Sequence, residues 1–346
     1  MKRSMCLQVL FLVTCIATGP AAAGTLRVPD DYTTIQEAID AATRGDTILV
    51  DGGTYEPPAD IVIDGKWNLF IIGGDWFDRP VVNGSFRLID SDDILLERFT
   101  VLGGVIISCN EGTVLRDCEI SDSGGAGVTV MSCPGGAYSE VLVAGCRITG
   151  NTGAGIEAEL SGGQAVFSNN TIHDNGGCGV SILHSYGSIS GNTIYGNGSD
   201  GVGIEDASFT VTENTIARNA LNGIRITSGL GPLTQLIHQN AIAANAVTGI
   251  YSGYSANLNI ACNDVWGNGP YEQENYGGNL TDLTGIYGNI LLDPRFCNPV
   301  NGDFSPADNS PLLIQACGIM GAYDAAGCEA IGAKERSWGE IKSLYK

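Results

Sequence analysis

The chain has 346 residues, of which 17 are Lys or Arg and 38 are Asp or Glu, so its formal net charge at pH 7 is −21. A surface this acidic repels nucleic acid and anionic lipid, which argues against partners of either kind. It keeps a protein soluble in water and is compatible with binding cations or neutral sugars.

Residues 1–23 have the pattern of a secretory signal peptide. They begin with Lys2 and Arg3, continue with an apolar run from Cys6 to Ala17, and end in small residues up to Ala23. The run is too short for a permanent transmembrane helix, and no later stretch approaches ~18 consecutive apolar residues. We therefore expect cleavage near Ala23 and an exported protein, extracellular, at the cell surface or periplasmic, that does not span the membrane.

A short helix is predicted in residues 33–46, TTIQEAIDAATRGD. Ile35, Ala38, Ile39 and Ala42 recur there at helical spacing, and the pattern stops at Gly45. The strand-like sequence TILVDGGTYE follows. We expect this amphipathic helix to cover the first coil of the repeat described next, whose edge strands would otherwise recruit other chains.

From about residue 118 the chain repeats one phrase, as in NTIHDNGGCGV, NTIYGNGSDGV and NTIARNALNGI. Its anchor residues are Ile120, Ile148, Ile172, Ile194, Ile216, Ile242 and Val265. Successive anchors are 22 to 28 residues apart, whereas a glycine always follows an isoleucine anchor after 7 residues. A fixed short step inside a variable longer period indicates stacked repeats with insertion-tolerant loops, and we assign the glycine to a corner of each repeat.

Each repeat also shows the two-residue alternation of β-strands. After the glycine, inward positions such as Val202 and Ile204 flank a residue that points outward, and a further strand precedes each anchor. Three short strands in about 22 to 24 residues are too few for a propeller blade and predict an all-β solenoid, a single-stranded parallel β-helix. We expect one domain over residues 24–333, with an N-terminal cap at 24–60, coils at about 61–290 and a closing segment at 291–333.

Asparagines recur at two fixed positions in the repeat. One set comprises Asn151, Asn175, Asn197, Asn219, Asn245 and Asn268, and the other Asn170, Asn192, Asn214, Asn240 and Asn263. In stacked coils each set would form a ladder of side-chain amides. Their repetition argues for a structural role, because a ligand site would need only one or two of them.

Nine cysteines follow the signal peptide, so at least one thiol lacks a partner within the chain. Cys109 and Cys133 occupy similar positions one coil apart, as do Cys118 and Cys146. Same-position residues in neighbouring coils lie ~5 Å apart, within disulfide range, although a stacked pair of buried thiols is equally compatible. No spacing indicates a metal site or a cofactor, and no motif indicates calcium.

One outward surface carries the candidate catalytic residues Glu157, Glu159, Glu205 and Arg225. Tyr251 lies in the same columns and Asp206 at their border, both as candidate substrate-binding residues. Glu159 and Glu205 are predicted two coils apart, ~10 Å between backbones, a separation that suits an acid/base pair at a glycosidic bond. The alternative is a solvated face on which Glu205 and Arg225 form a weak ion pair.

A second outward column, beside the anchors, contains His173, Tyr195 and Trp266. His173 and Tyr195 should be neighbours, and aromatic rings beside polar groups on a flat face favour binding of sugar rings. The alternative is ordinary cross-strand packing of aromatic side chains.

The last residues, 334–346, are basic and contain a capping-box pattern at Ser337 and Glu340. They predict either a short helix that docks on the final coil or a tail recognised by a secretion or surface-attachment partner.

Residues 28–57, VPDDYTTIQEAIDAATRGDTILVDGGTYEP, resemble the entry segment of bacterial secreted right-handed β-helix proteins of the pectin lyase-like superfamily. The resemblance continues through the repeats to about residue 290 and in the closing sequence DPRFCNPVNGDFSPADNSPLLIQACGIMGAYDAAGC. It implies a right-handed parallel β-helix and export. It does not imply an activity, because the superfamily includes lyases, hydrolases, epimerases and adhesins.

The same resemblance bears on the closing cysteines. Such relatives have a cysteine after a Ser-Pro pair, where this chain has Leu312. It therefore implies a Cys317–Cys328 pair and leaves Cys297 without an evident partner.

The catalytic constellations of related enzymes are missing. Neither the clustered aspartates of polygalacturonase-like hydrolases, nor the calcium-binding cluster of pectate lyase-like enzymes, nor the Asp-Pro-His-Glu segment of alginate epimerase-like proteins is present. His173, His184 and His238 fall at different repeat positions, which argues against a copper site. The sequence thus favours a noncatalytic protein that interacts with polysaccharide. A polysaccharide lyase, epimerase or glycoside hydrolase and a structural envelope component are the alternatives.

Overall fold

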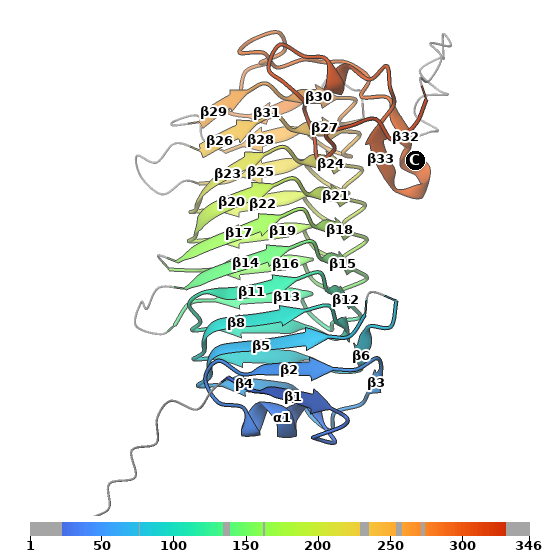
Figure 1. Cartoon of the computed structure of the whole chain (residues 1–346). Coiled ribbons are helices and arrows are strands. Elements are labelled where there is room, and N and C mark those ends of the chain that lie inside the picture. The colour runs from blue at the N-terminus through green and yellow to red at the C-terminus, as the bar shows by residue number, and fades with distance from the viewer. Residues whose placement is uncertain are drawn as a thin grey trace, which may run out of the picture.

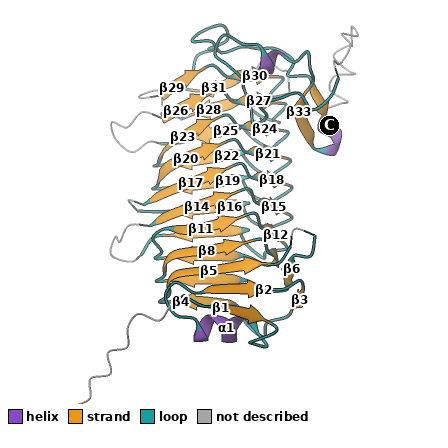
Figure 2. Cartoon of the chain, viewed as in Figure 1, coloured by secondary structure: helices purple, strands orange, loops and turns teal. Residues whose placement is uncertain are grey.

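The structure is a computed structural model that describes residues 23–75, 77–133, 139–161, 163–228, 235–253, 258–270 and 274–329. These residues form a solenoid of parallel strands in three sheets, which we name sheets A, B and C. Figure 1 shows the coils stacked along one axis, and Figure 2 shows that strands make up nearly all of the regular structure. The prediction of an all-β parallel β-helix is therefore confirmed.

Each coil contributes one strand to each sheet. Sheet A consists of β1 (Thr25–Val28), β2 (Thr47–Val50), β5 (Trp67–Gly73), β8 (Asp92–Glu97), β11 (Thr113–Arg116), β14 (Glu140–Ala144), β17 (Gln164–Ser168), β20 (Tyr186–Ser190), β23 (Ser208–Thr212), β26 (Gln235–His238) and β29 (Leu258–Ala261). Sheet B consists of β3 (Gly53–Tyr55), β6 (Pro80–Val82), β9 (Thr100–Leu102), β12 (Glu119–Ser121), β15 (Arg147–Thr149), β18 (Thr171–His173), β21 (Thr193–Tyr195), β24 (Thr215–Ala217), β27 (Ala241–Ala243) and β30 (Asp264–Trp266). Sheet C consists of β4 (Ile61–Asp64), β7 (Phe86–Ile89), β10 (Val105–Ser108), β13 (Val128–Met131), β16 (Ile156–Glu159), β19 (Val180–Leu183), β22 (Val202–Glu205), β25 (Ile224–Ile226), β28 (Ile250–Ser252) and β31 (Tyr276–Gly278).

The core is built by the inward positions of the repeat. The anchors pair with one another in register, for example Ile172 with Ile194 and Ile194 with Ile216. Val202 and Ile204 pair in the same way within sheet C and are fully buried. One coil could not bury these side chains alone, so the core exists only because the coils stack.

Both asparagine ladders are present. In every rung the side-chain Nδ2 donates to the Oδ1 of the next asparagine of the ladder, at 2.9 to 3.1 Å. Beyond the predicted sets, Asn289 extends the second ladder by one coil, and Asn275, which follows Asn268 in the same coil, ends the first. The amides are buried, and their bonding to each other and to backbone carbonyls satisfies groups that would be costly to bury alone.

The repeated glycine lies at the turn before each sheet C strand, but not because of its backbone angle. Gly201 is outside the left-handed region, whereas Gly191 and Gly196, which lie at other turns of the same coil, have φ of 66° and 64°. A Cβ on Gly201 would stand 2.5 Å from Ile216 Cγ2 and 2.7 Å from the carbonyl oxygen of Gly223. The glycine therefore lies at the predicted corner, and the close approach of the next coil requires it there.

The predicted helix forms as α1 (Ile35–Ala41) and lies across the end of the solenoid at which β1 is found (Figure 1). Thr34 caps it: the Thr34 hydroxyl accepts from the Glu37 N–H, and the Glu37 carboxylate accepts from the Thr34 N–H. Ile35, Ala38 and Ile39 are buried against the first coils.

The closing segment carries β32 (Phe296–Asn298), a 3-10 helix (Pro299–Asn301), β33 (Asp303–Pro306) and a second 3-10 helix (Pro311–Leu313). It folds back along sheet B (Figure 1) and forms a second hydrophobic core there. This core contains Ala217, Ala241, Ala243, Trp266, Phe296, Phe304, Leu312 and Met320. The small alanine side chains of sheet B leave room for the larger side chains of the closing segment.

Three disulfides join described residues, and they correct one expectation. Cys109 bonds to Cys133, as their positions one coil apart suggest. The pair Cys317–Cys328 implied by the resemblance is wrong, because Cys317 bonds to Cys262 and Cys328 bonds to Cys297. Of the remaining cysteines, Cys118 and Cys146 are the buried, unbonded thiols that the sequence left as an alternative to a disulfide.

Two contacts bring the cysteines of the closing segment to their disulfide partners. Cys328 forms a β-bridge with Ala307, directly after β33, which brings it beside the β32 strand that contains Cys297. Cys317 is held against the last coils by the Gln239 side chain, which donates to the Cys317 carbonyl at 2.8 Å. A sequence pattern contains neither contact.

Within the described ranges, no helix has the length and apolar character that crossing a membrane requires. The signal peptide predicted at residues 1–23, apart from its last residue, and the tail predicted at 334–346 lie outside the described residues.

Candidate functional site

The first outward column of sheet C aligns as predicted. Glu157 pairs with Ser181, Ser181 with Gly203, Gly203 with Arg225, and Arg225 with Tyr251, each one coil further along the solenoid. Glu157 is exposed, while Arg225 and Tyr251 are half-buried. Parallel pairing thus brings a carboxylate, a guanidinium and a phenol from three separate strands onto one surface.

The second column carries two more exposed carboxylates. Glu159 pairs with Leu183 and Leu183 with Glu205, so the two glutamates are two coils apart, ~10 Å between backbones. His184 directly follows Leu183 of this column, and its ring lies between the carboxylates of Glu159 and Asp206. Its Nδ1 is 3.9 Å from Glu159 Oε1 and its Nε2 is 3.8 Å from Asp206 Oδ2.

His184 belongs to the face although the sequence analysis did not select it. Its backbone has φ of 51° and that of Asp206 44°, so both residues lie in the left-handed region directly after their strands. Strand alternation does not predict side-chain direction at such a residue. The one available signal is that His184 and Asp206 occupy the same repeat position.

Arg225 is fixed by a buried aspartate. Its Nε donates to Asp200 Oδ2, at 2.5 Å, and Asp200 is only 1% exposed. The other oxygen, Asp200 Oδ1, accepts from the backbone N–H and the Nδ2 of Asn222. The alternative expectation of a Glu205–Arg225 ion pair is therefore wrong: among the described residues, the ion pair of Arg225 is with Asp200.

The electrostatics at Arg225 favour the charged guanidinium. Its partial burial alone would lower the pKa, but the hydrogen bond and the negative charge of Asp200 raise the pKa of Arg225 above its ordinary value. Because the geometry comes from a buried carboxylate that is itself held by two N–H groups, the guanidinium is presented in a defined orientation.

A free thiol borders the same surface. Cys178 is half-buried, and a Cβ added to Gly203 would stand 3.6 Å from both Cys178 Sγ and Arg225 Nη2. Burial raises the pKa of Cys178, and the Asp200 charge raises it further, against opposing effects of Ser199 and Arg225. A raised pKa keeps the thiol protonated, which makes it a poor nucleophile.

The aromatic column of sheet B does not form an exposed surface. His173 and Tyr195 are neighbours as predicted, with rings stacked at 4.7 Å between centroids. However, Phe304 of the closing segment packs on Tyr195 at 4.9 Å, His173 is 5% exposed and Trp266 is 7% exposed. Sugar binding by these three residues stays a prediction, and the burial of His173 and Trp266 argues against an open face there.

Sheet C therefore offers the accessible chemistry. Its carboxylates can accept hydrogen bonds from hydroxyl groups, and the guanidinium has five N–H donors, of which the described contacts engage the Nε side. The His184 ring nitrogens face two carboxylates, those of Glu159 and Asp206. Tyr251 adds a ring in register with Arg225.

Comparisons with known proteins concern the fold. Residues 96–235 match the family model described as a right handed beta helix region. The chain is similar to the crystal structure of an alginate lyase from Paenibacillus sp. str. FPU-7, at 14% identity and a TM-score of 0.59 over 74% of this chain and 98% of that one. It is also similar to pectate lyase Pel9A, at 12% identity and a TM-score of 0.51 over 88% and 97% of the two chains. No curated protein sequence matches it.

Proposed function

Because the chain is a right-handed parallel β-helix with the fold of the pectate lyase-like superfamily, we propose that it binds polysaccharide without cleaving it, on the outer face of sheet C. The proposed site comprises Glu157, Glu159, Glu205, Asp206, Arg225 and Tyr251. Both solved structures named above are called lyases of polysaccharides, alginate and pectate, which supports a ligand of this class.

The arrangement of Arg225 carries the proposal. A guanidinium anchored by a buried Asp200 loses less freedom on binding than a mobile surface arginine would, so its remaining donors are preorganised. Tyr251 lies beside it on the next strand, where a ring can pack against a sugar while the exposed glutamates accept from hydroxyl groups. An arginine whose only role was solvation would not need a buried partner.

Binding to a panel of neutral and acidic polysaccharides tests the proposal. We expect Arg225→Ala and Tyr251→Ala each to weaken binding by about tenfold or more, equivalent to about 1.4 kcal/mol, in affinity electrophoresis or calorimetry. Tyr251→Ala is the cleaner variant, because Arg225→Ala also leaves the Asp200 charge without its partner.

Sheet A supplies matched controls. Arg116 and Tyr186 are exposed on that sheet, so Arg116→Ala and Tyr186→Ala remove the same side-chain types from another face. Their affinities should remain unchanged. Equal losses in the sheet A and sheet C variants, or unchanged affinity in both Arg225→Ala and Tyr251→Ala, would reject sheet C as the binding face.

A lyase, epimerase or hydrolase is the second candidate, favoured by His184 between Glu159 and Asp206. A histidine beside carboxylates is suited to general acid–base catalysis. Incubation with the same panel, followed by unsaturated-product absorbance and reducing-end assays, separates the candidates. Turnover that disappears in Glu205→Gln would replace the noncatalytic proposal, and glycan binding without turnover would support it.

We place this function outside the cytoplasm, at the cell surface or in the surrounding medium. The three disulfides support an oxidising compartment, as does the signal-peptide pattern of residues 1–23. The same proposal includes a secretion or surface-attachment partner that binds residues 334–346.

A further inference from the structure

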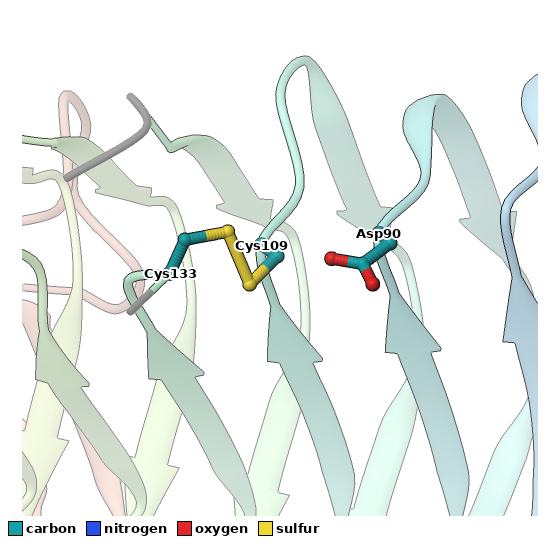
Figure 3. A group of neighbouring side chains, drawn as sticks. All are labelled: Asp90, Cys109 and Cys133. Carbon is teal, nitrogen blue, oxygen red and sulfur yellow. A yellow bond between two sulfur atoms is a disulfide. The ribbon is translucent and has the colours of Figure 1, made fainter. Parts of the chain in front are cut away.

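Three side chains with metal-binding atoms meet at one turn of the solenoid, on the coils directly before those of the proposed glycan site (Figure 3). Asp90 follows β7, Cys109 follows β10, and Cys133 lies just after β13. These three strands pair in parallel register, so their ends are stacked along the axis. One carboxylate oxygen and the two Sγ atoms lie within 4.8 Å of one another.

The local backbone supports this convergence. Asp90 and Cys109 both lie in the left-handed region, with φ of 47° and 60°, at the same position of successive coils. Figure 3 shows the Asp90 carboxylate directed toward the two sulfur atoms. Asp90 is exposed and both cysteines are half-buried, so a cation can reach the group from solvent.

We propose that Asp90, Cys109 and Cys133 form a binding site for a thiophilic divalent cation such as Zn²⁺ when the Cys109–Cys133 disulfide is reduced. Two thiolates and one carboxylate are a ligand set that Zn²⁺ accepts, with water as the fourth ligand. The excess of acidic residues in the chain raises the local concentration of cations.

The disulfide and the metal site exclude each other. In the disulfide, the two sulfurs are bonded to one another and neither is a thiolate. A trialkylphosphine and water reduce the bond: the phosphorus is oxidised to a phosphine oxide, and each sulfur gains one electron and one proton. Zn²⁺ then displaces the two thiol protons to solvent as it binds the thiolates.

Spacing in the sequence conceals this group. Cys109 and Cys133 are 24 residues apart, and Asp90 is a whole coil before Cys109, so no compact metal motif arises. Stacking of coils brings them together, as it does the outward columns of sheet C.

The test uses the full mature chain with Cys178→Ser, which removes the half-buried free thiol. The protein is reduced with the phosphine, desalted without oxygen and titrated with Zn²⁺ or Co²⁺. We expect one high-affinity ion per chain, a sulfur-to-cobalt charge-transfer band, and no such binding by the oxidised protein. Asp90→Asn should retain the band but weaken affinity by about tenfold or more.

The Cys109→Ser/Cys133→Ser double variant is the matched control. It keeps Cys262, Cys317, Cys297 and Cys328, which the phosphine also reduces, so any ion they bind remains in the control. The proposal fails if the double variant binds the same number of ions with the same band. It also fails in its three-ligand form if Asp90→Asn leaves the affinity unchanged.

Discussion

At Gly201, a single added methyl group would collide with three neighbours in the next coil. The Cβ would lie 2.5 Å from Ile216 Cγ2, 2.7 Å from the Gly223 oxygen and 2.8 Å from Asn219 Nδ2. Two of these contacts involve an anchor of the core and a rung of an amide ladder, which cannot move without disturbing their own stacks. The residue is thus selected by its lack of volume.

We predict that Gly201→Ala lowers the free energy of unfolding by roughly 1–3 kcal/mol, the usual cost of overpacking a close-packed interior. Chemical denaturation monitored by circular dichroism measures this change. Gly124→Ala is the control, since a Cβ at Gly124 meets nothing within 4 Å and its φ is not left-handed. Equal stability of the Gly201→Ala protein and the parent would show that the neighbouring coil yields easily.

At the scale of elements, a buried carboxyl group in the last coils accepts a hydrogen bond from the closing segment. Asp264, in β30, is 1% exposed, and its Oδ1 accepts from the Leu292 backbone N–H at 3.1 Å. Within the described residues, its Oδ2 has no hydrogen-bond partner. Burial raises the pKa of Asp264 well above its usual range, and the nearby Asp293 charge acts in the same direction against the Leu292 N–H.

This shift makes stability fall as the pH rises. A carboxyl group whose pKa is higher in the folded than in the unfolded state favours folding fully below the unfolded pKa of ~3.9, and the contribution is lost as the pH rises through the folded pKa. Asp264→Asn removes the titration while keeping the shape. We expect the variant to match the parent near pH 4 and to exceed its melting temperature increasingly toward pH 8, in thermal melts across that range.

Asp282 provides a control of opposite sign. Hydrogen bonds from Thr284 lower the pKa of Asp282, so Asp282→Asn should cost a little stability above the unfolded pKa of ~3.9, a cost that is lost as the pH falls through the folded pKa. If the parent and the Asp264→Asn protein changed with pH in parallel, the buried carboxyl group would not be the source of the dependence.

At the scale of the whole molecule, the sequence predicts those features that depend on contacts between neighbouring coils. The anchors, both asparagine ladders, the cap helix and the outward columns from Glu157 to Tyr251 all follow from a repeat whose contacts lie one coil away. The candidate surface on sheet C could therefore be located, although its detail could not. The Asp200–Arg225 contact and the place of His184 could not be predicted, because Asp200 lies at a turn and His184 has a left-handed backbone. Strand alternation does not apply at either position.

The closing segment could not be predicted in this way, because its position depends on contacts between distant residues. Thr193 donates to the Tyr323 hydroxyl across 130 positions of sequence, and Phe304 covers Tyr195. No periodicity encodes such contacts. For that reason the aromatic column was predicted as an open surface, and Cys317 and Cys328 were predicted as partners.

The asparagine ladders give the molecule a direction. Each side-chain amide donates toward the C-terminal end, so the two rows of dipoles run parallel, from Asn151 to Asn275 and from Asn170 to Asn289. Coils are consequently interchangeable only head to tail. Shortening or lengthening the molecule by one complete unit preserves this polarity, whereas an inverted unit would set donor against donor at one junction and acceptor against acceptor at the other. The ladders are thus compatible with a solenoid of different length, but not with a unit inserted in the opposite orientation.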